Sequence, residues 1–324
     1  MLPKARNYIL KTVRRGKLAI DIANYLRLRK KIKPLDDEWV FFCPAHSGDT
    51  YIFCCLSQAF IDKYGGYITV ITPEAYSSIP KLFPSISRIL VYKKFPSLNI
   101  GKFFMDVITE DNKDTVRQRA IWGFPNELLV PIAGYKDLRA VDSFKMFLGL
   151  DPEAKLVSPT MSDDLRDRAF KKFRELGLPL GNTVIFAPYA KSFPTLSMDN
   201  WVKIIEEMKK AGLYPVTNVG RNESPLPGTM GITVPFDEAL PISEFAGHIV
   251  SIRSGLCDVL STSRSKLTVI YPQQRYGRIS FYEYTSLKLN GLAGQEANIQ
   301  ELVYDNNENC KDVIEQTINF HIKG

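Results

Sequence analysis

The fold class follows first from WVFFCPAHSGDT, residues 39–50. Its first five residues are apolar and uncharged, which is typical of a strand buried on both faces of a parallel sheet. Apolar residues then recur at helical spacing over 50–64, and Gly65-Gly66 predicts the end of that helix. Two further apolar runs, at 67–71 and 88–92, predict strands. A strand, a helix and further strands in this order predict a parallel α/β domain.

A second α/β pattern begins after residue 180. The segment 152–181 before it is charged, carries a helical pattern over 163–176 and has no strand of its own. Strands are then predicted at 183–187, 214–219, 248–252 and 267–271, with helices at 198–211 and 256–263. We therefore expect two Rossmann-like domains, an N-terminal one over residues 34–175 and a C-terminal one over 176–324.

Length and composition agree with two folded domains. The chain has 324 residues, of which 45% are hydrophobic and 24% charged, so it is neither disordered nor a disulfide-rich miniprotein. No uncharged apolar run reaches the ~18 residues of a membrane-spanning helix. The five cysteines include no CxxC pair, which favours reduced thiols in a cytosolic protein over disulfides or a zinc site.

The positive charge is concentrated at the N-terminus. Residues 1–33 contain eleven Lys and Arg and a single acidic residue, Asp21. This leader therefore has a formal charge of +10 and the rest of the chain has −3, which gives the net charge of +7. Its apolar residues recur near helical spacing, which favours a basic amphipathic segment lying on an anionic membrane surface. The alternative is a solvated helix that packs on its own domain. Nucleic-acid binding is disfavoured, because no aromatic pattern or recognition motif accompanies the charge.

The loop between the first predicted strand and helix holds a candidate base. Gly48 allows a tight turn, and Asp49 occupies the cap or first turn of the helix. Helix capping alone would explain this aspartate. Alternatively, Asp49 acts as a general base in a cleft at the carboxyl ends of the strands, with His46 sharing or tuning its proton.

Two later loops contain residue types that suit a nucleotide. After the 183–187 strand, Lys191 supplies charge and Ser192 supplies a hydroxyl, which suits a phosphate, although an ordinary polar connection has the same composition. After the 214–219 strand comes a turn with Gly220 and Glu223. There Glu223 could accept hydrogen bonds from ribose hydroxyls.

A third loop, Arg253-Ser254-Gly255, connects a predicted strand to a predicted helix. Free backbone N–H groups at such a turn attract phosphate, and Arg253 could clamp an anion in bidentate fashion. The alternative is that Arg253 pairs with a neighbouring carboxylate and that Gly255 serves only the turn.

In this order, the motifs resemble the bacterial heptosyltransferase-like glycosyltransferases of the GT-B fold, over most of residues 38–272. The resemblance implies that Asp49 of Gly48-Asp49 is the base that activates the acceptor. It also implies that Lys191 and Ser192, after Ala187-Pro188, belong to the donor-phosphate loop and that Glu223 contacts the ribose. Ser254-Gly255-Leu256 matches a Thr-Gly-Leu turn that the family places between Asp and His. Here the flanking residues are Arg253 and Asp258, so Arg253 adds a positive charge where the family usually has a negative one.

The resemblance implies an inverting glycosyltransferase that uses a nucleotide-activated sugar to extend a bacterial surface glycan of lipopolysaccharide or capsule type. We expect it on the cytoplasmic face of the membrane, with no cofactor besides the donor substrate. The sequence contains no Asp-x-Asp, so we expect metal-independent transfer with Lys191, Arg253 and helix N-termini neutralising the diphosphate. A nucleotide-sugar epimerase of the same fold and a catalytically inactive, membrane-attached binding protein are the alternatives.

Overall fold

The computed structural model describes residues 37–43, 46–92, 138–190, 195–276, 278–305 and 310–323. The basic leader and the candidate residues Lys191 and Ser192 lie outside this part of the chain, and the predictions made for them remain predictions. The described residues form two parallel sheets, one from residues 38–92 and one from 183–304, and a two-stranded antiparallel pair. The predicted α/β class is therefore confirmed.

The smaller sheet and the helix α2 make up what we call the N-terminal lobe. Its strands run in the order β1-β2-β3, all parallel. The elements are β1 (Glu38–Phe42), α2 (Ser47–Tyr64), β2 (Tyr67–Pro73) and β3 (Ile86–Tyr92), with short 3-10 turns at Glu74–Tyr76 and Pro80–Leu82. Each predicted element of this region is confirmed, but α2 begins three residues earlier than the apolar pattern indicated.

The larger sheet and its helices form the C-terminal lobe. Within the described residues its strands run in the order β11-β8-β7-β4-β5-β6, and every neighbouring pair is parallel. Its strands are β4 (Thr183–Ala187), β5 (Tyr214–Asn218), β6 (Met230–Ile232), β7 (Gly247–Ile252), β8 (Lys266–Pro272) and β11 (Asn298–Tyr304). Its helices are α6 (Met198–Lys210), α7 (Ala239–Ala246), α8 (Gly255–Val259), α9 (Phe281–Thr285) and α10 (Cys310–Ile322), with a 3-10 turn at Leu260–Thr262 and a small β9 (Arg275–Tyr276) and β10 (Ile279–Ser280) pair.

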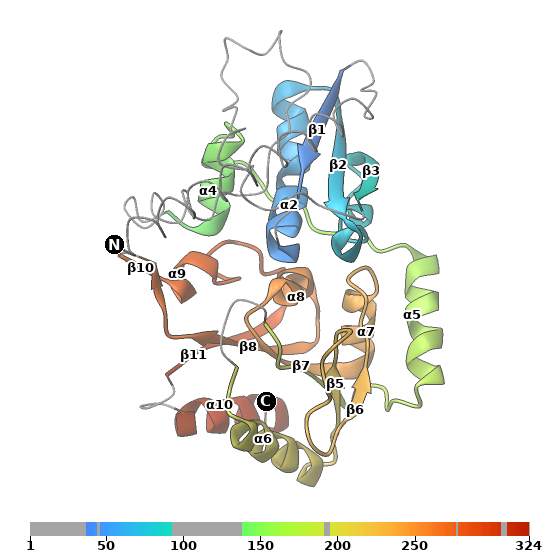
Figure 1. Cartoon of the computed structure of the whole chain (residues 1–324), viewed down its shortest axis with the longest axis vertical. Coiled ribbons are helices and arrows are strands. Elements are labelled where there is room, and N and C mark those ends of the chain that lie inside the picture. The colour runs from blue at the N-terminus through green and yellow to red at the C-terminus, as the bar shows by residue number, and fades with distance from the viewer. Residues whose placement is uncertain are drawn as a thin grey trace, which may run out of the picture.

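Helices cover both faces of this larger sheet, which explains why most residues of its central strands are apolar. Val184 and Phe186 of β4 pack with α6 and α10, while Ile185 and Ala187 of the same strand belong to the core on the opposite face. Figure 1 shows α6 and α10 together along one side of the sheet and α7 and α8 on the other. A strand buried on both faces is stabilised by apolar residues at every position, which makes it easy to recognise from sequence.

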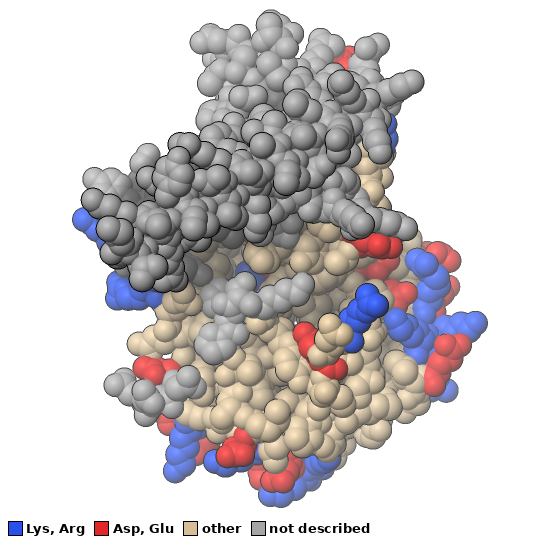
Figure 2. Space-filling model, in the orientation of Figure 1, with Lys and Arg blue, Asp and Glu red and all other residues tan. Residues whose placement is uncertain are grey.

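A helix that lies between the two sheets in chain order packs on the C-terminal lobe. This helix, α5 (Asp163–Glu175), buries Leu165, Ala169 and Phe173 and contacts α7, where Phe170 lies edge-on to Phe245 with ring centres 5.3 Å apart. Its opposite face is charged, and Figure 2 shows Lys, Arg, Asp and Glu gathered at that edge of the molecule. The predicted domain boundary falls at the end of α5 and stays a prediction.

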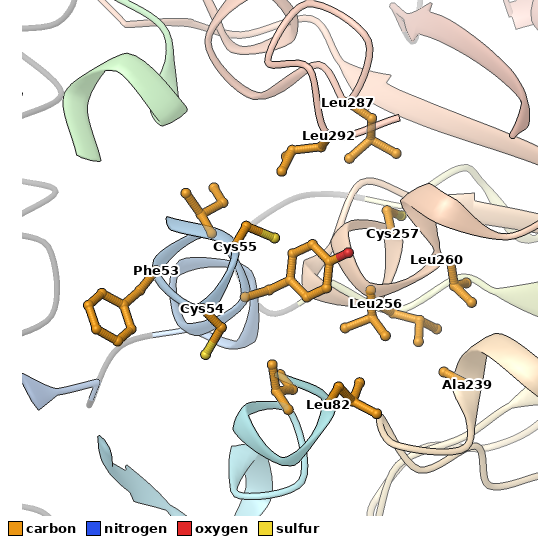
Figure 3. Packing of buried hydrophobic residues seen from close by; sticks show 14 of the residues in the cluster. Phe53, Cys54, Cys55, Leu82, Ala239, Leu256, Cys257, Leu260, Leu287 and Leu292 are labelled. Atoms are coloured by element: carbon orange, nitrogen blue, oxygen red, sulfur yellow. The ribbon is translucent and has the colours of Figure 1, made fainter. Parts of the chain in front are cut away.

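The two lobes share one hydrophobic core. Residues of α2, the 3-10 turns, α7 and α8 belong to a single buried cluster, and Figure 3 shows Leu256 and Leu260 of the C-terminal lobe on one side of α2. A further helix, α4 (Ala140–Phe147), is capped from the C-terminal lobe, because the side-chain oxygen of Asn290 accepts a hydrogen bond from the Val141 N–H at 2.9 Å. Among the described residues, no helix is long and apolar enough to cross a membrane.

Candidate active site

The N-terminus of α2 presents Asp49 at the boundary between the lobes. His46 is the N-cap residue and is exposed, whereas Asp49 lies in the first turn and is partly buried. The Oδ2 atom of Asp49 accepts a hydrogen bond from the His46 backbone N–H at 3.3 Å, which is half of a capping box. The capping role weighed for Asp49 is therefore present. The other carboxylate oxygen of Asp49, Oδ1, takes no part in this hydrogen bond.

The surroundings of Asp49 also favour its use as a base. Burial raises the pKa of its carboxyl group to about 6, against the opposing effects of His46 and its backbone hydrogen bond. The carboxylate of Asp258 raises this pKa further, and Arg253 lowers it. A carboxylate with a pKa near 6 is ionised at neutral pH and accepts a proton more readily than an ordinary aspartate.

Two glycines bring the first turns of α2 and α8 into contact. A Cβ atom on Gly48 would overlap Oδ2 of Asp258, and a Cβ atom on Gly255 would overlap Oγ of Ser47 and lie 2.6 Å from the Gly48 nitrogen. Both glycines have ordinary backbone angles, so close approach, and not a special conformation, requires them here. Gly48-Asp49 and Ser254-Gly255, placed in separate loops by the sequence, therefore meet in space.

Arg253 occupies the arrangement that the sequence analysis gave as the alternative. Its NH1 and NH2 groups donate to the two carboxylate oxygens of Asp258 at 2.9 and 2.6 Å, and its Nε donates to the Thr285 carbonyl at 3.1 Å. Both partners are buried, with side-chain exposures of 8% and 1%. The guanidinium is thus directed at protein groups, and its ion pair with Asp258 stabilises the turn before α8. Ser254, the N-cap residue of α8, is only partly buried.

The candidate nucleotide residues Gly220 and Glu223 lie at the carboxyl end of β5. Glu223 is exposed, and its Oε2 accepts a hydrogen bond from the Gly220 N–H at 2.7 Å, so these two residues form one turn. Tyr189, which follows β4, donates from its hydroxyl to the Ser224 carbonyl at 2.5 Å and so joins the two loops. Parallel pairing of β4 with both β5 and β7 places the loops after all three strands at the same edge of the sheet.

Asp258 is the site residue that sequence reasoning did not select. It appeared only as a flank of the Ser-Gly-Leu turn, and its contact with Arg253 is not implied by a spacing of five residues. One signal in the sequence pointed to this pair. The resembled motif has Asp before the turn and His after it, and this chain has the basic Arg253 and the acidic Asp258 instead. Among the described residues, no group of three or more His, Cys, Asp or Glu side chains is placed to hold a metal ion.

No protein-family model and no curated protein sequence matches this chain. Among solved structures, it is similar to a glycosyl transferase of family 9 from Veillonella parvula, with a TM-score of 0.54 and 12% identity over 84% of this chain and 87% of that one. It is also similar to the E. coli ADP-heptose lipopolysaccharide heptosyltransferase II, with a TM-score of 0.56 and 12% identity over 88% of this chain and 99% of that one. The chain has the GT-B fold.

A third similar structure is the E. coli heptosyltransferase WaaC with ADP, with a TM-score of 0.51 and 12% identity over 88% of this chain and 99% of that chain. These structures confirm the resemblance to the heptosyltransferase-like glycosyltransferases at the level of fold. In this chain, the contact between α2 and α8 joins the N-terminal lobe to the C-terminal lobe. The similarity shows the fold, so the roles proposed for individual residues rest on the geometry of this contact.

Proposed function

We propose that this protein is a glycosyltransferase that transfers a sugar from a nucleotide-activated donor to a hydroxyl group of a bacterial surface glycan. The observation that carries the proposal is the placement of Asp49, a partly buried carboxylate with a pKa raised to about 6, at the contact between the two lobes. The fold shared with heptosyltransferases supports the class of reaction. A lipopolysaccharide or capsule-type glycan is the acceptor we propose.

The proposed reaction proceeds with inversion. The acceptor oxygen attacks the anomeric carbon while its proton passes to the Asp49 carboxylate. The bond between that carbon and the diphosphate oxygen breaks, and the nucleoside diphosphate leaves with the electron pair. Backbone N–H groups near Ser254 and the Lys191 side chain are proposed to stabilise the charge of the leaving group, so that no metal ion is needed. Glu223 is proposed to accept hydrogen bonds from the ribose of the donor, and His46 to adjust the proton affinity of Asp49.

Nucleotide release from a panel of nucleotide sugars, with and without glycan acceptors, tests the function. We expect release that depends on an acceptor and that falls by ~10² or more in Asp49→Asn, since a positioned base contributes about that factor. Asparagine keeps the oxygen that accepts from His46, so the variant should fold. Asp312→Asn is the matched control, because Asp312 is exposed on α10, away from the lobe contact.

Each other outcome contradicts the proposal in a distinct way. Conversion of the free nucleotide sugar without an acceptor would indicate an epimerase of this fold. Binding of a nucleotide sugar with no turnover under any acceptor would indicate a binding protein. Turnover of Asp49→Asn at the rate of the intact protein would remove Asp49 from the mechanism while leaving transferase activity in place.

A further inference from the structure

The carboxylate of Asp258 crosses from the C-terminal lobe to the first turn of α2. Asp258 lies on α8 and is 1% exposed, and its Oδ2 occupies the position that a Cβ on Gly48 would need. The residue after Gly48 is Asp49, and the Asp258 charge acts on the Asp49 carboxyl group. A buried acidic side chain of one lobe therefore faces the turn that carries the proposed base on the other.

Arg253 fixes the position of this carboxylate. Its two bonds to Asp258 are bidentate, the arrangement that best defines the orientation of a carboxylate. The guanidinium is itself held by the carbonyl oxygens of Thr285 and Ser254, at 3.1 and 2.6 Å. Asp258 therefore cannot turn away from α2 without leaving a buried cation unpaired, which is costly.

We propose that Asp258 is a positioning residue, whose carboxylate, clamped by Arg253, packs against the first turn of α2 and keeps Asp49 a competent base. This role rests on the glycosyltransferase function proposed above. It also gives a reason for the Arg and Asp flanks of the Ser-Gly-Leu turn, since Arg253 holds the Asp258 carboxylate against the first turn of α2.

Three charged groups act on Asp49 from the elements around it, and one neutral thiol lies near it. His46 at the α2 N-cap and Arg253 before α8 favour the ionised carboxylate, and Asp258 on α8 favours the protonated form. Cys43, at the end of β1, is held as a neutral thiol because burial and Asp49 both raise its pKa. Of the three charged groups, Asp258 is the one whose charge makes Asp49 hold its proton more tightly, and so the one that strengthens it as a base.

Two variants of the full chain test the proposal. Asp258→Asn removes the negative charge and unmasks Arg253, so both effects lower the pKa of Asp49. We expect the Asp49 carboxyl titration, followed by ¹³C NMR and assigned with Asp49→Asn, to move down by about one pH unit, the order of one nearby charge. The acid limb of kcat/KM should move with it. The double variant Arg253→Gln/Asp258→Asn removes both charges and should give a smaller shift, and Asp312→Asn should give none.

The outcomes separate this proposal from the proposed function. An unmoved Asp49 titration in both folded variants would overturn the role of Asp258. Failure of both variants to fold would also overturn it, because the ion pair would then serve the fold alone. If the intact protein shows no transfer but the titration shifts as expected, the positioning holds and the transferase function fails. A shifted titration with an unmoved acid limb would mean that Asp49 is not the base.

Discussion

The imidazole rings of His248 and His321 face each other in the C-terminal lobe, with their Nδ1 atoms 3.1 Å apart. His248 lies on β7 and His321 near the end of α10, and both are buried. The Nε2 of His321 is 3.0 Å from the Thr268 hydroxyl. Burial, then His248 and Lys266, lower the pKa of His321 to about 3, so this pair joins the C-terminal helix to the sheet in its uncharged form.

This pair predicts a loss of stability in mild acid. Below pH 6.5 the unfolded chain protonates His321, while the folded protein does not until about pH 3, so stability falls as the pH falls through this window. The contribution is up to about 1.4 kcal/mol per pH unit. Chemical denaturation between pH 7.5 and 4.5 should show a shallower dependence in His321→Gln. Asp312→Asn, at an exposed position of the same helix, is the control, and equal slopes in all three proteins would exclude the effect.

Removing Arg253 is predicted to destabilise the protein strongly. Arg253→Ala leaves the buried Asp258 carboxylate without its partner, which typically costs about 3–5 kcal/mol. Arg264→Ala removes an arginine from an exposed pair with Glu296, with side-chain exposures of 71% and 69%, and should cost less than about 1 kcal/mol. Urea unfolding measures both. A small effect of Arg253→Ala, together with lost affinity for the nucleotide, would return Arg253 to the anion clamp considered from sequence.

How much of the fold the sequence predicts depends on burial. Strands β4, β7 and β8 were located to within one residue because nearly all of their residues are buried and most of these residues are apolar. Strand β11 was missed because its run contains Gln300 and Glu301. The structure shows why a glutamate is tolerated there: Glu301 accepts hydrogen bonds from the Tyr271 hydroxyl and the Leu287 N–H.

The site shows a different limit. Asp49 was selected from its place after a strand and glycine, which is local information. The pairing of Arg253 with Asp258 and the contact of both loops across the lobes depend on tertiary packing, and no periodicity encodes them. The sequence therefore predicted the residues of the loops, while the partner of each charged group required the structure. Roles for Lys191 and Ser192 remain predictions, because these residues lie outside the described part of the chain.

The basic leader is predicted to attach the protein to anionic membranes. Deleting residues 1–33 removes +10 of charge and an amphipathic pattern, and should abolish co-sedimentation with anionic vesicles. For the intact chain, ~0.5 M salt should weaken binding through screening. Neutral vesicles are the control for the lipid charge. If the truncated protein still co-sediments, another surface binds the membrane.

Transfer is predicted to persist after thorough chelation. The expectation rests on the lack of an Asp-x-Asp sequence and on the proposal that Lys191 and backbone N–H groups neutralise the diphosphate. Nucleotide release should be within about twofold after EDTA treatment and gel filtration. Full loss of activity that magnesium or manganese restores would show that the reaction needs a metal ion.

The last prediction concerns the contact of the lobes at Gly48. An alanine in a helix is ordinarily more stable than glycine by up to about 1 kcal/mol, so Gly48→Ala would stabilise α2 if its surroundings were open. Here the added Cβ overlaps the Asp258 carboxylate, and Arg253 prevents that carboxylate from moving. Overpacking of this kind costs about 1–3 kcal/mol, so destabilisation should win.

A double-mutant cycle separates this overlap from any other effect of Gly48→Ala. In an Arg253→Leu/Asp258→Ala background the obstructing carboxylate is absent, and the same change should become neutral or stabilising. Gly231→Ala provides the reference, because its Cβ would lie 3.4 Å from Val219, an ordinary contact. Equal destabilisation by Gly48→Ala in both backgrounds would show that the cost arises within α2. If Gly48→Ala lowers stability only when Asp258 is present, glycine is required at residue 48 because the acidic side chain of the other lobe occupies the space beside it.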